Sequence, residues 1–161
     1  MSPADPASAG YARALKLERR LDAPAAAVWR CWTEPALLAR WFTPAPWVTV
    51  SAEIDLRAGG RFATLMRSPE GAEFPNEGVL LEVVPGLRLV FTDAYAAGWE
   101  PAAKPFFTGI VEIADDGAGG TAYVAHSRHW TEEDRRRHEE MGFHQGWNTA
   151  ADQLEALARS L

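Results

Sequence analysis

The C-terminal residues 131–161 form one amphipathic run with the length and spacing of a long helix. Thr131 can cap the first turn, where Glu132, Glu133 and Asp134 place carboxylates at the positive end of the helix dipole. Larger residues then recur mostly at steps of three or four, which is typical of a helix with one buried face. These residues are Met141, Phe143, Trp147, Ala151, Leu154, Ala158 and Leu161. A helix of this kind needs an apolar partner, which the rest of the chain must supply.

Residues 47–130 have the pattern of short strands joined by turns. Pro and Gly mark the turns at residues 58–60, 68–71 and 85–86, while a longer loop is expected at 94–105. Short strands joined by hairpin turns predict an antiparallel sheet. The six expected strands are Trp47–Leu56, Arg61–Arg67, Glu73–Val84, Leu87–Asp93, Phe106–Ala114 and Thr121–Trp130.

The N-terminal part adds a tail, a strand and two short helices. Residues 1–12 are rich in Ala, Ser and Pro, so we expect a disordered tail. Residues 12–21 alternate as in a half-exposed strand, and residues 25–42 have helical spacing interrupted at Pro35. Together with the sheet and the C-terminal helix, this order predicts one α+β domain over residues 13–161, with six to seven strands.

Composition excludes several classes of protein. A net charge of −6 and a pI near 5.2 argue against a nucleic-acid partner, because phosphate binding requires a concentrated basic surface. The chain has no apolar stretch of the roughly 20 residues that a membrane helix needs, and no signal peptide is visible. The single cysteine, Cys31, lies in an apolar helical pattern and is expected to be an inert buried thiol. We expect a cytoplasmic protein that binds neither nucleic acid nor membrane.

Several segments resemble one family. They are Leu21–Pro24 with Val28–Trp29 and Trp41–Phe42, Asp55–Phe62, Ser68–Gly71, Glu77–Val83, and His144–Trp147 with Leu154. In this order they resemble the START-like (SRPBCC) superfamily, in the branch of homologues of the heat-shock-protein-90 ATPase activator. The resemblance covers nearly the whole chain. It implies a helix-grip fold, in which a curved antiparallel sheet wraps the C-terminal helix, and a cavity that commonly holds an apolar small molecule.

The resemblance and the strand alternation together select candidate ligand-binding residues. Residues on the less polar side of each strand, with nearby helix and loop residues, should line the cavity. They are Trp41, Phe62, Thr64, Met66, Glu77, Leu81, Phe91, Trp99, Phe107, Met141, His144 and Trp147. In the last strand, either Tyr123, Ala125 and Ser127 or the alternate residues face inward. Gly142 and Gly146 would leave space beside the helix.

Three residues are candidates for acid–base chemistry, namely Glu77, His126 and His144. Glu77 can equally lie at a wet strand end, and His144 can form an ordinary surface pair with Glu140. No metal site is expected. His126 and His129 lie on opposite faces of a strand, and His138 and His144 are about 120° apart on a helix. No catalytic triad order or phosphate loop is present, and no cofactor is implied.

The sequence therefore favours a binding protein for a small hydrophobic or aromatic molecule. A cyclase- or hydrolase-type enzyme remains open, provided that at least two of Glu77, His126 and His144 face one cavity. A chaperone-interaction module is the third hypothesis and depends only on the family branch. Both a monomer and a homodimer agree with the sequence.

Overall fold

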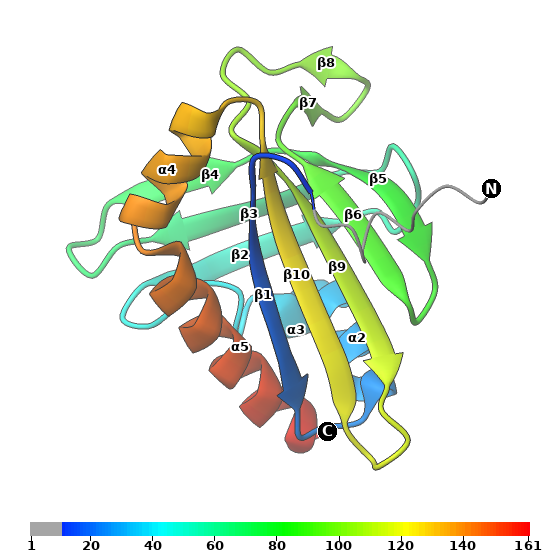
Figure 1. Ribbon diagram of the computed structural model, residues 1–161. Helices are drawn as coiled ribbons and strands as arrows, with labels where there is room; N and C mark the ends of the chain where they lie inside the picture. The colour runs from blue at the N-terminus through cyan, green and yellow to red at the C-terminus, as the bar shows by residue number, and fades with distance from the viewer. Residues whose placement is uncertain (1–10) are drawn as a thin grey trace.

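A computed structural model describes residues 11–161 and shows two antiparallel sheets folded around a helix (Figure 1). The larger sheet has the order β1-β10-β9-β6-β5, and the smaller has the order β2-β3-β4. The strands are β1 (Ala14–Leu21), β2 (Val48–Ile54), β3 (Phe62–Arg67), β4 (Glu73–Asn76), β5 (Val79–Val84), β6 (Arg88–Thr92), β9 (Phe107–Asp115) and β10 (Thr121–His129). A small hairpin of β7 (Tyr95–Ala96) and β8 (Glu100–Pro101) lies within the predicted loop.

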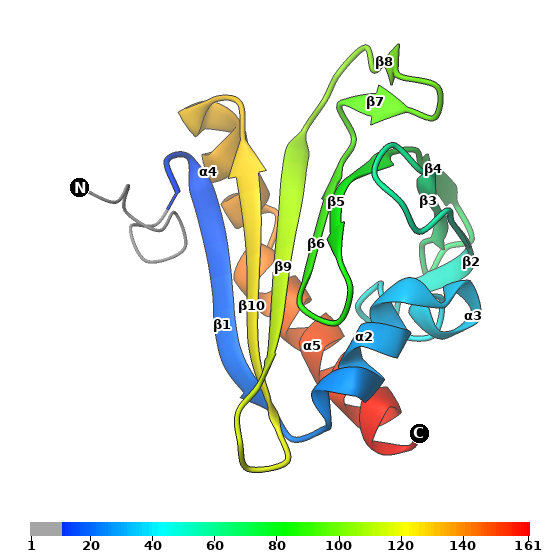
Figure 2. The ribbon, with the colours of Figure 1, turned by 90° about the vertical axis from the view of Figure 1, so that its right-hand side faces the viewer.

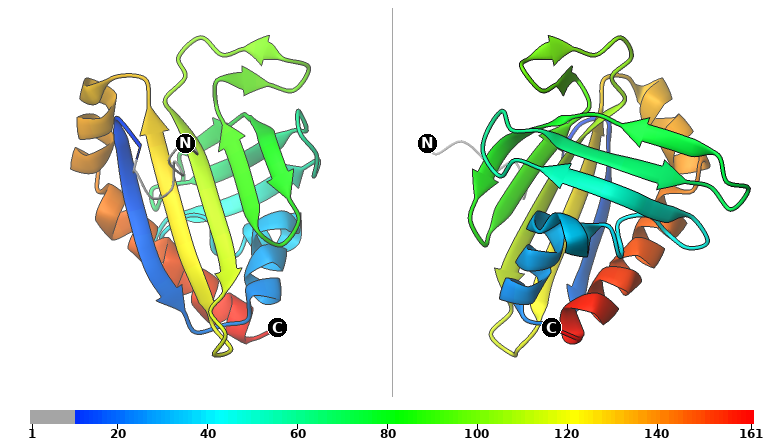
Figure 3. Two further views of the ribbon diagram at one scale, coloured as in Figure 1. Left: turned by 45° about the vertical axis from the view of Figure 1, so that its right-hand side comes forward. Right: turned by 180° about the vertical axis from the view of Figure 1, so that it is seen from behind.

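The helices are α2 (Ala25–Thr33), α3 (Pro35–Leu38), α4 (Glu132–Glu140) and α5 (Phe143–Arg159). Figure 2 shows the two sheets on either side of the space that α5 crosses. In Figure 3, α2 and α3 lie at the end of this space opposite α4. This arrangement confirms the predicted α+β helix-grip fold. The predicted tail falls almost entirely on residues 1–10, which lie outside the described residues.

The two sheets meet where the chain passes from β4 to β5. The amide of Phe62 donates to the carbonyl oxygen of Gly78 at 3.0 Å. The amide of Leu80 donates to the carbonyl oxygen of Gly60 at 2.9 Å. A Cβ on Gly78 would lie 2.5 Å from the carbonyl oxygen of Thr92, so only glycine fits this close approach. The prediction of one continuous strand over residues 73–84 is therefore wrong, because the chain changes sheets at this glycine.

The predicted C-terminal helix is also divided. Thr131 caps α4 as expected, and its hydroxyl accepts a hydrogen bond from the amide of Asp134 at 3.0 Å. The helix then stops at Met141, because Gly142 adopts a φ of 100° in the left-handed region, where a side chain would be strained. A second helix begins at Phe143. Gly142 is thus the break between two helices, while Gly146 lies within α5.

Helix α5 supplies one wall of the core. Its residues Ala151, Leu154 and Ala158 are buried and belong to the main apolar cluster. The other members of this cluster come from the inner faces of the sheets and from α2 and α3. They include Leu17, Leu21, Val28, Trp32, Leu38, Phe62, Leu80, Leu89, Val111, Ile113 and Tyr123. The thiol of Cys31 is buried as expected, and burial raises its pKa to about 11.

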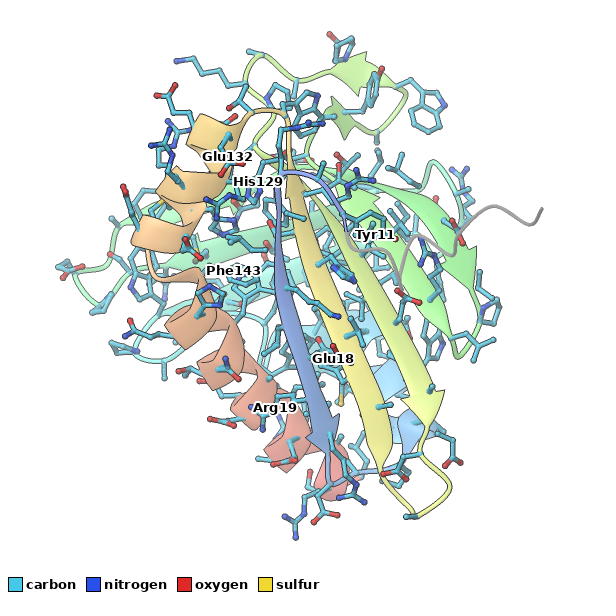
Figure 4. The ribbon with its side chains drawn as sticks, in the orientation of Figure 1. Tyr11, Glu18, Arg19, His129, Glu132 and Phe143 are labelled. Atoms are coloured by element: carbon cyan, nitrogen blue, oxygen red, sulfur yellow. The ribbon has the colours of Figure 1, made fainter. Side chains whose placement is uncertain are left out.

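The structure resolves which side of the last strand faces inward. Tyr123 and Ala125 are part of the apolar cluster, whereas His126 lies on the opposite face of β10. There the ring of Tyr11, which Figure 4 labels, meets that of His126 edge-on, with centroids 4.7 Å apart. Among residues 11–161, no helix has both the length and the hydropathy needed to cross a membrane.

Candidate functional site

A cavity of about 460 Å³ lies between the sheets, α2–α3 and α5. This volume falls within the range typical of small-molecule sites. Most of its lining is apolar or aromatic, and the exposed side chains of Asn76, Glu77 and Met141 also border it, so the cavity opens to the surface there. Its principal aromatic lining residues are Trp32, Trp41, Phe42, Trp47, Phe62, Phe91, Phe107, Tyr123, Phe143 and Trp147.

The aromatic side chains contact one another and form a continuous wall. The ring centroids of Phe62 and Phe91 are 4.9 Å apart, and those of Phe143 and Trp147 are 4.5 Å apart. Phe107 connects the two pairs, with its centroid 6.0 Å from those of Phe91 and Trp147. Offset and edge-on contacts of this kind hold the rings in fixed orientations. The wall is therefore an ordered apolar surface, against which a flat molecule could stack.

Polar groups in the cavity are few and are mostly satisfied by the protein. The hydroxyl of Tyr123 accepts a hydrogen bond from the indole nitrogen of Trp32 at 3.1 Å, deep in the core. The carboxylate of Asp93 accepts bonds from the amides of Phe106 and Phe107 at 2.9–3.2 Å. Burial raises the pKa of Asp93, against the opposing effect of these amide bonds.

A cluster of Ser127, His129 and His138 lies at the end of the cavity that α4 covers. The Nε2 atom of His129 is 2.9 Å from Nδ1 of His138, and the Ser127 hydroxyl is 3.2 Å from each of these nitrogens. The Nδ1 atom of His129 is 3.2 Å from the carbonyl oxygen of Arg13. Only His138 borders the cavity. Figure 4 places His129 at the end of β10, close to the start of α4.

The His138 imidazole lies among aromatic rings. Its centroid is 5.0 Å from that of Phe106, 5.4 Å from that of Phe107 and 5.3 Å from that of Phe143. Burial in these surroundings lowers the pKa of His138 to about 4, and the neighbouring His129 lowers it further. Burial also lowers the pKa of His129. Both rings are therefore neutral at pH 7.

Most of the predicted ligand-binding residues border the cavity. Trp41, Phe62, Thr64, Met66, Phe91, Phe107 and Trp147 line its walls, and Glu77 and Met141 lie at its opening. Glu77 is paired with Arg61, and Met141 is 70% exposed. The alternation of β3 placed Phe62, Thr64 and Met66, and the helical spacing of α5 placed Trp147.

Three predicted positions do not line the cavity. Leu81 points outward because a β-bulge between Leu80 and Glu82 reverses the alternation of β5. Trp99 is 55% exposed and lies against Gly59. His144 lies on the exposed face of α5, where its Nε2 is 2.9 Å from a carboxylate oxygen of Glu139.

The predicted acid–base residues are not brought together. His126 is on the outer face of β10 and His144 on the outer face of α5, so only Glu77 borders the cavity. The enzyme hypothesis required two of these three groups at one cavity, and that condition is not met. Within residues 11–161, no group of three or more His, Cys, Asp and Glu side chains is arranged to hold a metal ion.

Sequence reasoning missed the Ser127–His129–His138 cluster. The histidine pairs considered from the sequence were His126 with His129 and His138 with His144, and each pair was expected within a single strand or helix. The actual pair joins a strand to a helix nine residues later. The available signal was the short connection at Trp130–Thr131, which folds α4 back beside the end of β10.

The histidine cluster predicts a specific pH dependence of stability. An unfolded histidine titrates near pH 6.5, whereas His138 in the folded protein titrates near pH 4, so the unfolded chain binds more protons between these values. Stability should therefore fall as the pH decreases from 6.5 to 4. In His138→Gln this fall should be smaller by about 2 kcal/mol, after allowance for residual exposure of the ring.

Chemical denaturation of both proteins across this pH range measures the difference. The neighbouring titratable and charged groups are His129 on β10, Asp93 after β6, and Asp134 and Arg135 on α4. They are present in both proteins, and Asp93, with its raised pKa, contributes with the opposite sign. Parallel pH profiles of the wild type and the variant would show that His138 is not held neutral by its surroundings.

The comparisons with known proteins agree with the fold. The family model described as "Activator of Hsp90 ATPase homolog 1-like protein" matches residues 22–159. A search of curated proteins gave no match. A crystal structure of a protein from Nitrosomonas europaea is similar, with 43% identity, a TM-score of 0.90 and coverage of 94% of this chain and 97% of that one.

Two more distant structures show the same fold. A Mycobacterium smegmatis protein is 22% identical, with a TM-score of 0.76 and coverage of 92% of both chains. A protein from Aeromonas hydrophila, itself described as AHSA1-like, is 24% identical, with a TM-score of 0.66 and coverage of 88% of this chain and 93% of that one. At these identities the similarity concerns the fold alone.

Proposed function

The chain belongs to the family of Activator of Hsp90 ATPase homolog 1-like proteins, and on this premise we propose that it binds a small apolar or aromatic molecule between its sheets and α5. The observation that carries this proposal is the 460 Å³ cavity, whose lining is mostly apolar and includes ten Phe, Trp and Tyr side chains. A packed core of this size would normally fill such a space with side chains, since protein interiors contain few voids larger than a water molecule.

The chemistry of the walls supports an apolar occupant. A two-ring aromatic molecule could stack against Phe91, Phe107 and Trp147 and lose most of its contact with water. Burial of its surface provides the driving force at roughly 25 cal/mol per Å². After the cost of immobilising the ligand, we expect a dissociation constant on the order of 10–100 µM for a molecule with about ten non-hydrogen atoms.

Equilibrium dialysis with naphthalene tests the proposal. The wild type should bind one equivalent, and Ala150→Phe should weaken binding about tenfold or more, because Ala150 borders the cavity and a larger side chain would occupy it. Leu81→Ala is the matched control, since Leu81 lies outside the cavity and its truncation should leave the affinity unchanged. Native mass spectrometry of the purified protein then searches for a co-purified ligand.

Two results would contradict the proposal. The first is failure of the wild type to bind naphthalene or any apolar molecule of similar size. The second is equal binding by the wild type and a folded Ala150→Phe variant, because the ligand would then occupy another surface. A thermal melt of each variant establishes that it is folded. The chaperone-interaction hypothesis has support only from the family name.

A further inference from the structure

The contacts within the Ser127–His129–His138 cluster determine which ring nitrogen of His129 and of His138 carries a proton. A carbonyl oxygen can only accept, so the 3.2 Å contact between the Arg13 oxygen and Nδ1 of His129 requires a proton on that nitrogen. Neutral His129 therefore has no proton on Nε2. This bare Nε2 is 2.9 Å from Nδ1 of His138, and two bare nitrogens would repel each other at that distance. The shared proton must belong to His138 Nδ1.

The other nitrogen of His138 follows from this assignment. Neutral imidazole carries one proton, and because that proton is on Nδ1, Nε2 of His138 has a free lone pair. Within residues 11–161, Nε2 of His138 has no hydrogen-bond partner. The atom is also not fully buried. The atom is therefore accessible to solvent or to a ligand, and its ring borders the cavity.

The charges around the cavity restrict the ligand further. No lysine or arginine side chain is among the described residues that line it, while the carboxylates of Glu77 and Asp93 are. A buried ligand carboxylate would lose its hydration without gaining a cationic partner, which is strongly unfavourable. A neutral ligand avoids this cost. A neutral O–H or N–H group could instead donate to the bare nitrogen.

We propose that Nε2 of His138 accepts a hydrogen bond from a neutral O–H or N–H donor, and that the cavity thereby selects hydroxylated or amino-substituted aromatic molecules over unsubstituted and anionic ones. This inference rests on the proposed binding function. His138 would contact the ligand directly, whereas His129 acts through it as a positioning residue. Ser127 is fully buried, so its hydroxyl can stabilise the two rings but cannot reach a ligand.

Three molecules with the same two-ring skeleton test whether the cavity prefers a hydroxylated ligand. They are naphthalene, 2-naphthol and 2-naphthoate. Equilibrium dialysis at pH 7 should show the wild type binding 2-naphthol about fivefold more tightly than naphthalene, as expected for one net hydrogen bond. The anionic 2-naphthoate should bind more weakly than naphthalene. Failure of all three to bind contradicts the proposed function itself. Equal binding of naphthalene and 2-naphthol leaves that function intact and overturns only the present inference.

Matched variants identify the acceptor. His138→Phe should lose the preference for 2-naphthol over naphthalene, because phenylalanine suits the surrounding rings but accepts no hydrogen bond. His138→Gln should retain part of the preference, because its amide oxygen is an acceptor. A full preference for 2-naphthol in His138→Phe would overturn the assignment.

The tautomer of His138 can be measured independently of ligand binding. Nitrogen-15 chemical shifts of the wild-type imidazoles should show His138 protonated at Nδ1 and bare at Nε2. In His129→Phe the neighbour that fixes this proton is removed, so both tautomers of His138 should be populated and the preference for 2-naphthol should decrease. A wild-type His138 that is bare at Nδ1 contradicts the proposal whatever the affinities.

Discussion

Leu154→Ala is expected to lower the free energy of unfolding by about 3–4 kcal/mol while leaving the affinity for naphthalene within about twofold. The Leu154 side chain is fully buried and belongs to the main apolar cluster, but it does not border the cavity. Its truncation removes apolar contacts and leaves a void in a packed region. Helix α5 is thus divided between a segment near Trp147 that faces the cavity and a segment beyond Ala151 that does not.

Urea denaturation and equilibrium dialysis measure the two effects separately. Leu161→Ala is the control for stability, because Leu161 follows the end of α5 and is 47% exposed, so its truncation should cost less than about 0.5 kcal/mol. A loss of ligand affinity in Leu154→Ala as large as that in Ala150→Phe would show that the division of α5 is incorrect.

Gly60→Ala is expected to destabilise the protein by about 3 kcal/mol or more, or to prevent folding. A Cβ at this position would lie 1.9 Å from the carbonyl oxygen of Asp55, which is backbone and cannot rotate away. The same turn joins the sheets, because Gly59 donates to Leu80 at 2.7 Å and Gly60 accepts from Leu80 at 2.9 Å. Movement of the turn would therefore separate β3 from β5.

Ala58→Gly is the matched control in the same turn. Ala58 is exposed, so removal of its methyl group should change the free energy of unfolding by less than about 1 kcal/mol. Thermal and urea denaturation of both variants provide the comparison. Gly60→Ala with wild-type stability would show that this turn does not require the tight backbone approach seen here.

The elements of the fold were largely predictable because their patterns are local. The alternation in β3 placed Phe62, Thr64 and Met66 on the inner face, and the helical spacing placed Phe143 and Trp147 on the buried face of α5. Periodicity of this kind reports burial directly, since each side chain has one fixed direction relative to its element.

The failures occurred where the backbone departs from regular geometry. A bulge at Leu80–Glu82 turned Leu81 outward, and the left-handed Gly142 divided a helix that its amphipathic pattern treated as continuous. Neither the bulge nor the left-handed glycine changes the hydrophobic pattern enough to be predicted from the sequence. The pairing of His129 with His138 depends on how α4 folds back on β10, which is a tertiary property.

We propose that the cavity between the sheets and α5 holds an aromatic ligand, and isotope-filtered NMR of the protein with 2-naphthol would locate the ligand. Intermolecular contacts are expected from the ligand to Phe91, Phe107 and Trp147. Contacts confined to exposed aromatic side chains, such as Trp99 and Trp130, would contradict it.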